Sequence, residues 1–318
     1  MNVSVIIPAQ ASDAPHLAGT LRGIGDQRYD AGRVEVFVVQ YGASAAGAEA
    51  PPIVPPGLHV HFLSVDNPSP YAARNLASRA ASGEVLLFTE PGCVPDPAWI
   101  AAHVAALRDS PATLVVGHVA PARETWAVAT FLSYEGVRDA WVFSGASWQH
   151  LFGRPKNMAI LRRRFDSHGP FAEVIRGADS KLVQHVAREL SCDEIGHAPG
   201  AVVRQEVVRG LPSCLRDRFV HARALRVHKS SHAAPIALSE RVRLFRETVA
   251  TRRYGFAQAG MLLAFLGAGI AAFRLGGASA RFVRLPVIHH GDHTGQDSPG
   301  RLRTPDRQRQ QQDRRKQD

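Results

Sequence analysis

Residues 71–100 constrain the fold more than any other stretch, because they combine a helix, a turn, a strand and an acidic loop. Apolar residues recur at helical spacing over 72–81, and a Ser-Gly pair then ends the helix. The unbroken apolar run at 85–88 is typical of a strand that is covered on both faces of a parallel sheet. Open α/β sheets bind ligands at the carboxyl ends of such strands, which makes Glu90 a candidate site residue.

The residues before this stretch repeat the alternation of strand and helix. Apolar runs at 3–7, 34–39 and 59–65 predict three strands, and residues 16–24 predict a helix between the first two. Because three strand-then-helix units precede Glu90, we expect an α/β fold built on a parallel, doubly wound sheet.

Several blocks of this chain resemble the family 2 glycosyltransferases, which have the GT-A fold. The matching residues around the central stretch are Ala73-Arg74-Asn75, Gly83, Phe88, Cys93-Val94-Pro95-Asp96-Pro97 and Trp99. Those further along are Asn157-Met158-Ala159, Arg162 and Gly169-Pro170-Phe171. The resemblance extends over residues 1–205. It implies a Rossmann-like, doubly wound, mostly parallel sheet and the transfer of a sugar from a nucleotide-sugar donor.

The resemblance also implies roles for individual residues. The positions expected to bind the nucleotide-sugar donor are Pro8, Gln10, Gln40, Gly42, Arg74, Asn75, Glu90 and Gly92. Those expected on the acceptor side are Asn157, Met158, Gly177 and Ala178. Asp179 stands where the family has its catalytic base, which takes the proton from the acceptor hydroxyl. The alternative for Asp179 is a helix N-cap, a position that Asp often fills.

The expected metal site departs from the family pattern. The two aspartates of the family's Asp-x-Asp loop fall on Glu90 and Gly92, and Gln205 stands where the family has a histidine. A divalent cation normally shares several oxygen ligands, so Glu90 would hold Mn²⁺ or Mg²⁺ together with the donor phosphates and waters. The alternative is that basic side chains neutralise the diphosphate without a metal; the candidates are Arg74, Lys156 and Arg176.

The C-terminal third is basic and contains one apolar segment, residues 254–273. This segment carries no charge and has arginines at both ends. Twenty helical residues just span a bilayer core, so the helix crosses a membrane, lies at its surface or packs on the domain. The formal net charge of +10 is concentrated in this third. It favours attraction to anionic lipid headgroups over nucleic-acid binding, because no nucleic-acid-binding module is visible.

These observations predict three parts. They are a GT-A domain over residues 1–210, a basic helical region over 211–285 and a disordered basic tail over 286–318. The first residues lack a signal-peptide pattern, and the three cysteines have no disulfide or metal spacing. We therefore expect a cytoplasmic protein that associates with the inner face of the membrane.

The predicted function is that of an inverting glycosyltransferase. It would move a sugar from a nucleotide-sugar donor to a cell-envelope, lipid-linked or secondary-metabolite acceptor, either a sugar or a small molecule. The alternative is a GT-A-fold binding or scaffold protein without catalysis, because several expected acids and a histidine are replaced. The replacing residues are Gln40, Gly92, Ala178 and Gln205. Metal-dependent nucleotide binding would favour the enzyme, and no nucleotide binding would favour the scaffold.

Overall fold

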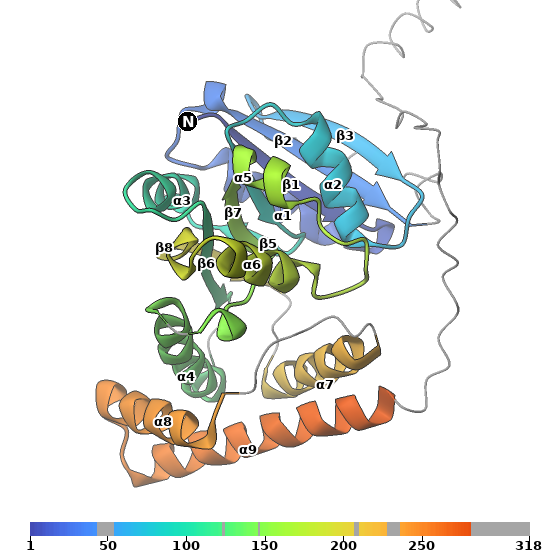
Figure 1. Ribbon diagram of the computed structural model, residues 1–318. Coiled ribbons are helices and arrows are strands. Elements are labelled where there is room, and N and C mark those ends of the chain that lie inside the picture. The colour runs from blue at the N-terminus through green and yellow to red at the C-terminus, as the bar shows by residue number, and fades with distance from the viewer. Residues whose placement is uncertain (43–53, 123–124, 146, 207–209, 228–235, 281–318) are drawn as a thin grey trace, which may run out of the picture.

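A mixed sheet of eight strands forms the centre of the computed structural model, which describes residues 1–42, 54–122, 125–145, 147–206, 210–227 and 236–280 (Figure 1). The strands are β1 (Val3–Ala9), β2 (Val34–Tyr41), β3 (His59–Val65), β4 (Val85–Thr89), β5 (Cys93–Pro95), β6 (Leu114–Pro121), β7 (Asn157–Leu161) and β8 (Ile195–Gln205). The helices are α1 (Ala14–Gly25), α2 (Pro70–Ala80), α3 (Trp99–Arg108), α4 (Trp126–Phe143), α5 (Arg162–His168), α6 (Ala178–Glu189), α7 (Leu211–Val227), α8 (Leu238–Arg252) and α9 (Phe256–Ser279). The expected tail at 286–318 lies outside the described residues.

The order of the strands is β3-β2-β1-β4-β7-β6-β8-β5. β1 lies parallel to β2 and β4, β2 parallel to β3, and β6 parallel to β8. β7 runs antiparallel to both β4 and β6, and β5 runs antiparallel to β8. The mostly parallel α/β sheet confirms the predicted fold class. The reversed direction of β7 brings the residue before it, Lys156, to the carboxyl end of β4.

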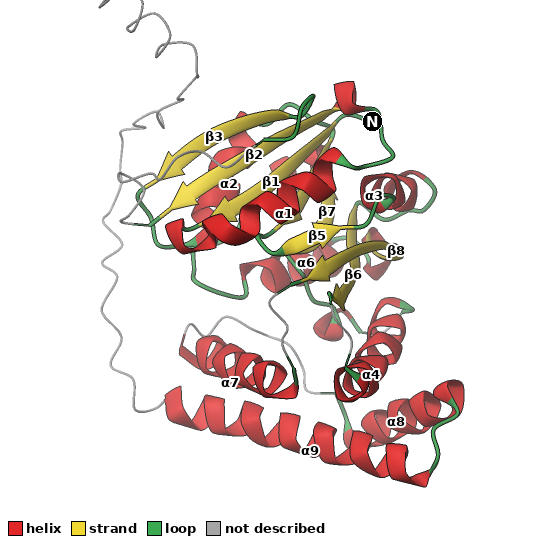
Figure 2. Cartoon of the chain, turned by 180° about the vertical axis from the view of Figure 1, so that it is seen from behind, coloured by secondary structure: helices red, strands yellow, loops and turns green. Residues whose placement is uncertain are grey.

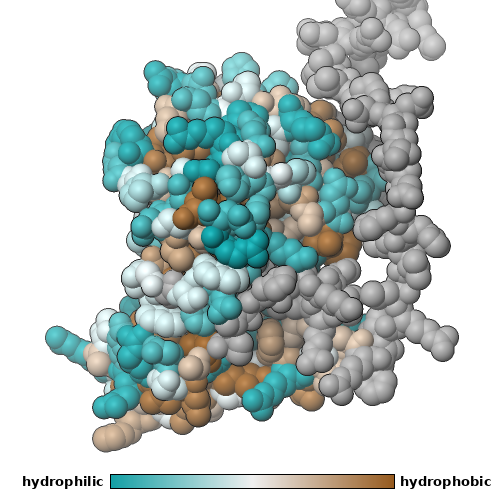
Figure 3. Space-filling view, in the orientation of Figure 1, coloured by the Kyte–Doolittle hydropathy of each residue, from teal (hydrophilic) through white to brown (hydrophobic). Residues whose placement is uncertain are grey.

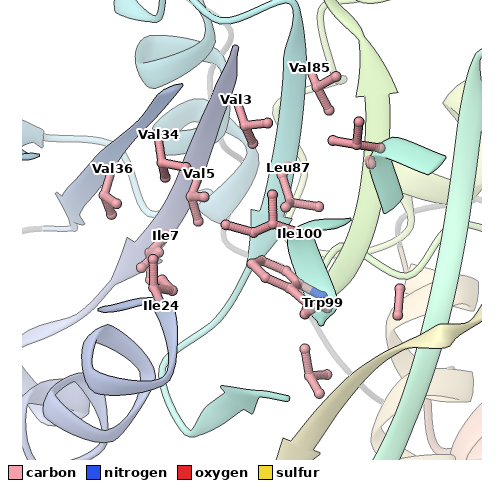
Figure 4. Packing of buried hydrophobic residues seen from close by; sticks show 14 of the residues in the cluster. Val3, Val5, Ile7, Ile24, Val34, Val36, Val85, Leu87, Trp99 and Ile100 are labelled. Carbon is pink, nitrogen blue, oxygen red and sulfur yellow. The ribbon is translucent and has the colours of Figure 1, made fainter. Parts of the chain in front are cut away.

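Helices cover both faces of the sheet. Alternate residues of each strand point to opposite faces, so each strand contributes to two cores. Val3, Val5 and Ile7 of β1 belong to a core shared with α1 and α3, where Trp99 is fully buried (Figure 4). Ile6 belongs to the opposite core, which is shared with α2, α5 and α6. Figure 2, seen from behind, shows α1 on the face away from α2. This double cover explains why the strands read as continuous apolar runs.

The helix α2 is fixed at its start by Ser69 and Pro70. The Ser69 hydroxyl accepts hydrogen bonds from the backbone N–H groups of Tyr71 and Ala72, and Pro70 occupies the first helical position, where it needs no N–H partner. Residues three and four positions apart share one face of a helix. Tyr71 therefore lies on the same buried face as Arg74 and Asn75.

A layer of four helices, α4, α7, α8 and α9, lies below the sheet (Figures 1 and 2). Tyr134 of α4, Leu244 of α8 and Leu262 of α9 form a small core of their own. Two glycines bring α9 close to α7: a Cβ at Gly269 would lie 3.3 Å from Arg218 Cδ, and one at Gly276 would clash with the backbone oxygen of Phe219. α9 therefore packs closely against α7, and it runs along the lower edge of the protein in Figure 1.

The apolar helix expected at 254–273 is observed as α9. Among the described residues it is the one helix that is long and apolar enough to cross a membrane, by length and composition alone. Of its most apolar 18-residue stretch, 11% is buried within the protein. Protein covers one side of the helix, and its opposite side is exposed.

Candidate active site

The ends of β1 and β2 meet at one edge of the sheet, as expected for a nucleotide site. The register pairs Ala9 with Gln40, so Gln10 and Gly42 follow at neighbouring strand ends. Gly42 has φ +92°, a backbone conformation that favours glycine, and its N–H donates to the Val65 oxygen at 3.3 Å. Pro8, predicted at the donor site, is instead buried within β1. Gln10 is exposed, and a Cβ at Gly42 would lie 3.9 Å from Gln10 Nε2, so these two residues lie close together.

Arg74 and Glu90 form a salt bridge at the carboxyl end of β4. The distance from Arg74 Nη2 to Glu90 Oε1 is 2.6 Å. The Arg74 side chain is 1% exposed and that of Glu90 is 39% exposed. The Arg74 guanidinium also lies over the ring of Tyr71, 5.2 Å from its centroid. The charge of Glu90 is therefore compensated within the protein by a buried cation.

Asp179 lies in the first turn of α6 and is 7% exposed. The Tyr71 hydroxyl donates a short hydrogen bond to its Oδ1, and the Ser180 hydroxyl donates to its Oδ2 at 3.3 Å. Burial raises the pKa of Asp179 above its usual range, and it outweighs the opposing effects of the Tyr71 hydrogen bond and the Arg74 charge. The carboxylate makes no N-cap hydrogen bond; the N-cap is Gly177, with φ +88°. Asp179 is thus a buried carboxylate of increased basicity.

Two further residues of the expected donor site hold the backbone in place. Asn75 forms a reciprocal pair with Phe171: its Nδ2 donates to the Phe171 oxygen at 2.9 Å, and its Oδ1 accepts from the Phe171 N–H at 3.0 Å. The N–H of Gly92 donates to Thr20 Oγ1 at 3.0 Å, and Gly92 has φ +78°. Both residues shape the loops around the site from below its surface.

The residues expected on the acceptor side lie in the core. Asn157 is fully buried, and its Oδ1 accepts from Trp99 Nε1 at 2.8 Å and contacts His103 Nε2 at 2.7 Å. Its Nδ2 donates to two backbone oxygens, of His118 and Ala201. Met158, Gly177 and Ala178 are also buried. Asn157 therefore links β6, β7, β8 and α3.

A cavity of about 850 Å³ lies between this edge of the sheet and the helical layer. The sheet side contributes Glu90, Lys156, Arg176 and Gln205, and the helical side contributes residues of α4, α7, α8 and α9. Six Arg or Lys side chains and four Asp or Glu side chains line it, so the lining carries an excess of positive charge. This balance suits an anionic ligand of the size of a nucleotide sugar.

One wall of the cavity is a network around the buried Asp139. Its carboxylate pairs with Arg138 Nη2 at 2.7 Å and with Arg154 Nη2 at 2.6 Å. Burial acts to raise the pKa of Asp139, but the two arginines outweigh it and hold the pKa below its usual range. Glu135 pairs with Arg138 and also with Arg218 of α7 at 2.5 Å. This network joins the 153–156 loop to the helical layer.

The side chains at the expected metal site do not form a set of metal ligands. Glu90 is engaged by Arg74, and Gly92 has no side chain. The amide oxygen of Gln205 accepts from Lys156 Nζ at 3.0 Å. Within the described residues no group of three or more His, Cys, Asp or Glu side chains is placed to hold a metal ion. Because a divalent cation prefers several carboxylate or carbonyl ligands, this site does not fit one well.

Tyr71 was not among the site residues expected from the sequence. Its side chain contacts Asp179 directly and reaches Glu90 through Arg74. Its contact with Asp179 spans 108 positions in the chain. A signal was present, since Tyr71 precedes Arg74 and Asn75 by three and four positions and so had to share their face of the helix. The Asp139 network was also missed, because it depends on packing between α4 and a distant loop.

The described fold is of the GT-A type, and the comparisons with known proteins identify the family of the chain. The family model described as "Glycosyl transferase family 2" matches residues 4–181, more than half of the chain. The chain belongs to this family, and it is a glycosyltransferase. No curated protein matches the sequence.

Three solved structures with similar folds have sequences distant from this chain. A mannosyltransferase from Pyrobaculum calidifontis, in complex with GDP-Man and Mn²⁺, is 21% identical with a TM-score of 0.51, covering 90% of this chain and 76% of its own. TarS 1–349 from S. aureus is 13% identical (TM-score 0.46), covering 89% and 87%. Glucosyl-3-phosphoglycerate synthase from Mycobacterium tuberculosis is 18% identical (TM-score 0.45), covering 70% and 78%. The first of these supports the shared fold.

Proposed function

We propose that this protein transfers a sugar from a nucleotide-sugar donor to a hydroxyl acceptor with inversion, and that Asp179 is the catalytic base. One observation carries the proposal: a continuous series of contacts joins Asp179 to Glu90 through Tyr71 and Arg74. The proposed base and the proposed diphosphate end of the site therefore belong to one constellation. A nucleotide-sugar donor is also consistent with the GDP-Man bound by the Pyrobaculum mannosyltransferase.

The reaction needs a proton acceptor on one side and compensation of negative charge on the other. The acceptor oxygen forms a bond to the anomeric carbon on the face opposite the leaving group. The bond between that carbon and the diphosphate oxygen breaks, and its electron pair stays on the diphosphate. The acceptor proton passes to the Asp179 carboxylate, whose raised pKa makes it a stronger base than an ordinary carboxylate.

The test is the variant Asp179→Asn, which keeps the shape of the side chain and an oxygen that can accept the Tyr71 hydrogen bond. Turnover is measured as release of nucleoside diphosphate from GDP-mannose, UDP-glucose and UDP-N-acetylglucosamine with a panel of acceptors. Loss of a general base should lower turnover by about 10²- to 10⁴-fold. Affinity for the nucleoside diphosphate, measured by calorimetry, should stay nearly unchanged.

The matched control is Asp166→Asn, which changes an exposed aspartate of α5. Its turnover should equal that of the wild type. Undiminished turnover in Asp179→Asn would remove Asp179 from the mechanism. Nucleotide binding without turnover of any donor in the wild type would instead support the alternative of a binding protein.

We also propose that the protein works at the inner face of a membrane and that α9 lies flat on its surface. The outer side of α9 exposes large apolar residues: Phe256 (101%), Leu263 (60%), Ile270 (39%) and Leu275 (63%). Figure 3 shows apolar side chains gathered along the lower edge of the protein, where α8 and α9 lie. A helix that is apolar all round needs cover on both sides, and protein covers only one.

The charges near α9 favour an anionic lipid surface as this cover. Arg252 and Arg253 precede the helix, and Arg274 lies in its last turns. All three are exposed, and basic residues next to a lipid surface each contribute about 1 kcal/mol of attraction. Arg252 and Phe273 also line the cavity. A lipid-linked acceptor would therefore reach the cavity from the membrane side.

This membrane proposal predicts co-sedimentation with vesicles of phosphatidylcholine and phosphatidylglycerol, and less with phosphatidylcholine alone. The double variant Phe256→Ser, Leu263→Ser should bind less, whereas Leu190→Ser, at an exposed position beyond α6 (45%), should bind like the wild type. Equal sedimentation of all three proteins would contradict the proposal. A dimer in solution that this double variant abolishes would assign the apolar face to a second copy of the chain.

A further inference from the structure

Lys156 immediately precedes β7 and lies next to the carboxyl end of β4. Thr89 pairs with Asn157 in the antiparallel register of β4 and β7, so the next residues outward, Glu90 and Lys156, lie side by side. The backbone oxygen of Lys156 accepts a hydrogen bond from Thr89 Oγ1 at 3.1 Å, which fixes this arrangement. Gln205 comes to the same point from the end of β8, because it pairs with Cys93 of β5.

The Lys156 ammonium is held by a neutral partner. Its Nζ donates to the amide oxygen of Gln205 at 3.0 Å. No ion pair joins Lys156 to a carboxylate in the part of the chain that the structure describes, since the neighbouring Glu90 pairs with Arg74 at 2.6 Å. An ammonium has three N–H donors, and the Gln205 contact uses one of them. Lys156 thus brings a positive charge to the cavity wall that the protein orients without neutralising it.

This arrangement conflicts with a divalent cation at the same position. A cation beside Glu90 would share its carboxylate with Arg74, a buried arginine, and would lie next to the ammonium of Lys156. The amide oxygen of Gln205, the remaining oxygen ligand at this position, already accepts a hydrogen bond from Lys156. Like charges in such close contact repel, and the repulsion is stronger in a partly buried site than in water.

We propose that the Lys156 ammonium, oriented by Gln205, binds the diphosphate of the nucleotide-sugar donor and takes the place of a metal ion. The inference rests on the proposed function, because it names the group that stabilises the leaving diphosphate. When the sugar–oxygen bond breaks, Lys156 donates hydrogen bonds to the diphosphate oxygens and compensates their growing charge. Arg176, an exposed residue of the same cavity wall, supplies the second cation.

The experiment measures the affinity of the full chain for UDP and for GDP by calorimetry, once with EDTA and once with MnCl₂. The wild type should bind one of them with nearly equal affinity in both buffers. Lys156→Met should weaken binding in EDTA by roughly 10- to 100-fold, which is the contribution of hydrogen bonds from a charged group. Lys156→Arg, which keeps the charge, should retain most of the affinity.

The matched control is Lys181→Met, which removes a lysine of α6 that does not line the cavity. Its affinity should equal that of the wild type. Binding by the wild type that requires MnCl₂ would overturn the inference and leave the proposed function standing, and this result needs no variant to fold. Unchanged affinity in folded Lys156→Met would also overturn it. Absence of any diphosphate binding by the wild type would contradict the proposed function itself, and the inference would fall with it.

Discussion

The salt bridge between Arg74 and Glu90 gives the first prediction. Substituting Glu90 tests whether its carboxylate stabilises the fold by pairing with Arg74 or binds a metal ion. Glu90→Gln keeps the shape and one hydrogen-bond acceptor but removes the charge. A hydrogen bond to a charged group contributes about 1.5–3 kcal/mol, against about 0.5–1.5 kcal/mol for a neutral one. Arg74 is 1% exposed but Glu90 is 39% exposed, so solvent reduces this difference. We expect the free energy of unfolding to fall by about 1 kcal/mol and Tm by about 2–4 °C.

The assay is thermal and urea unfolding in EDTA. The control is Glu189→Gln, which breaks an ion pair with Arg188 between two side chains that are both about half exposed, 49% and 57%. Such surface pairs contribute little, so this variant should unfold like the wild type. Equal stability of both variants would refute the reasoning that Arg74 depends on Glu90. A rise in Tm on adding MnCl₂ to the wild type, absent in Glu90→Gln, would show that Glu90 binds the cation.

Two further predictions concern the surroundings of Asp179. The Tyr71 hydrogen bond lowers the pKa of Asp179, so Tyr71→Phe should raise that pKa further. Since the base acts in its ionised form, the acid limb of the pH–turnover profile should move to higher pH; an unmoved limb would contradict the contact. A Cβ at Gly153 would lie 2.7 Å from Asp179 Cβ, so Gly153→Ala should displace the carboxylate. We expect it to lower turnover with little change in nucleoside diphosphate affinity, and equal turnover would refute this.

The parts of the fold that could be predicted from the sequence are those set by local patterns. Continuous apolar runs indicated strands buried on both faces, and each of the strands expected before residue 90 is present. Glu90 follows from the same reasoning, because a ligand site lies at the carboxyl end of such a strand. Asp179 could be found only through the resemblance, since its own surroundings in the sequence equally suit a helix cap.

The parts that could not be predicted depend on contacts between distant segments. Arg74 was expected at the donor site, but the sequence does not reveal that the packing of α2 buries its side chain and pairs it with Glu90. Asn157 was expected to face the acceptor, yet it lies between Trp99 and the backbone of β8, which no spacing in the sequence reveals. The helical layer is a further case, because it joins α4 to α8 and α9 across about a hundred residues.

The order of contacts across the site gives the proposed roles a physical basis. Asp179 receives hydrogen bonds from neutral groups, namely the hydroxyls of Tyr71 and Ser180 and a backbone N–H, and burial raises its pKa above the usual range in spite of them. Glu90 lies beyond Tyr71 and forms an ion pair with the buried Arg74. Lys156 comes next and keeps a charge that no carboxylate neutralises among the described residues. Because the proposed proton acceptor and the proposed diphosphate-binding cation lie at opposite ends of this series, the proposed mechanism separates the two charges that glycosyl transfer creates.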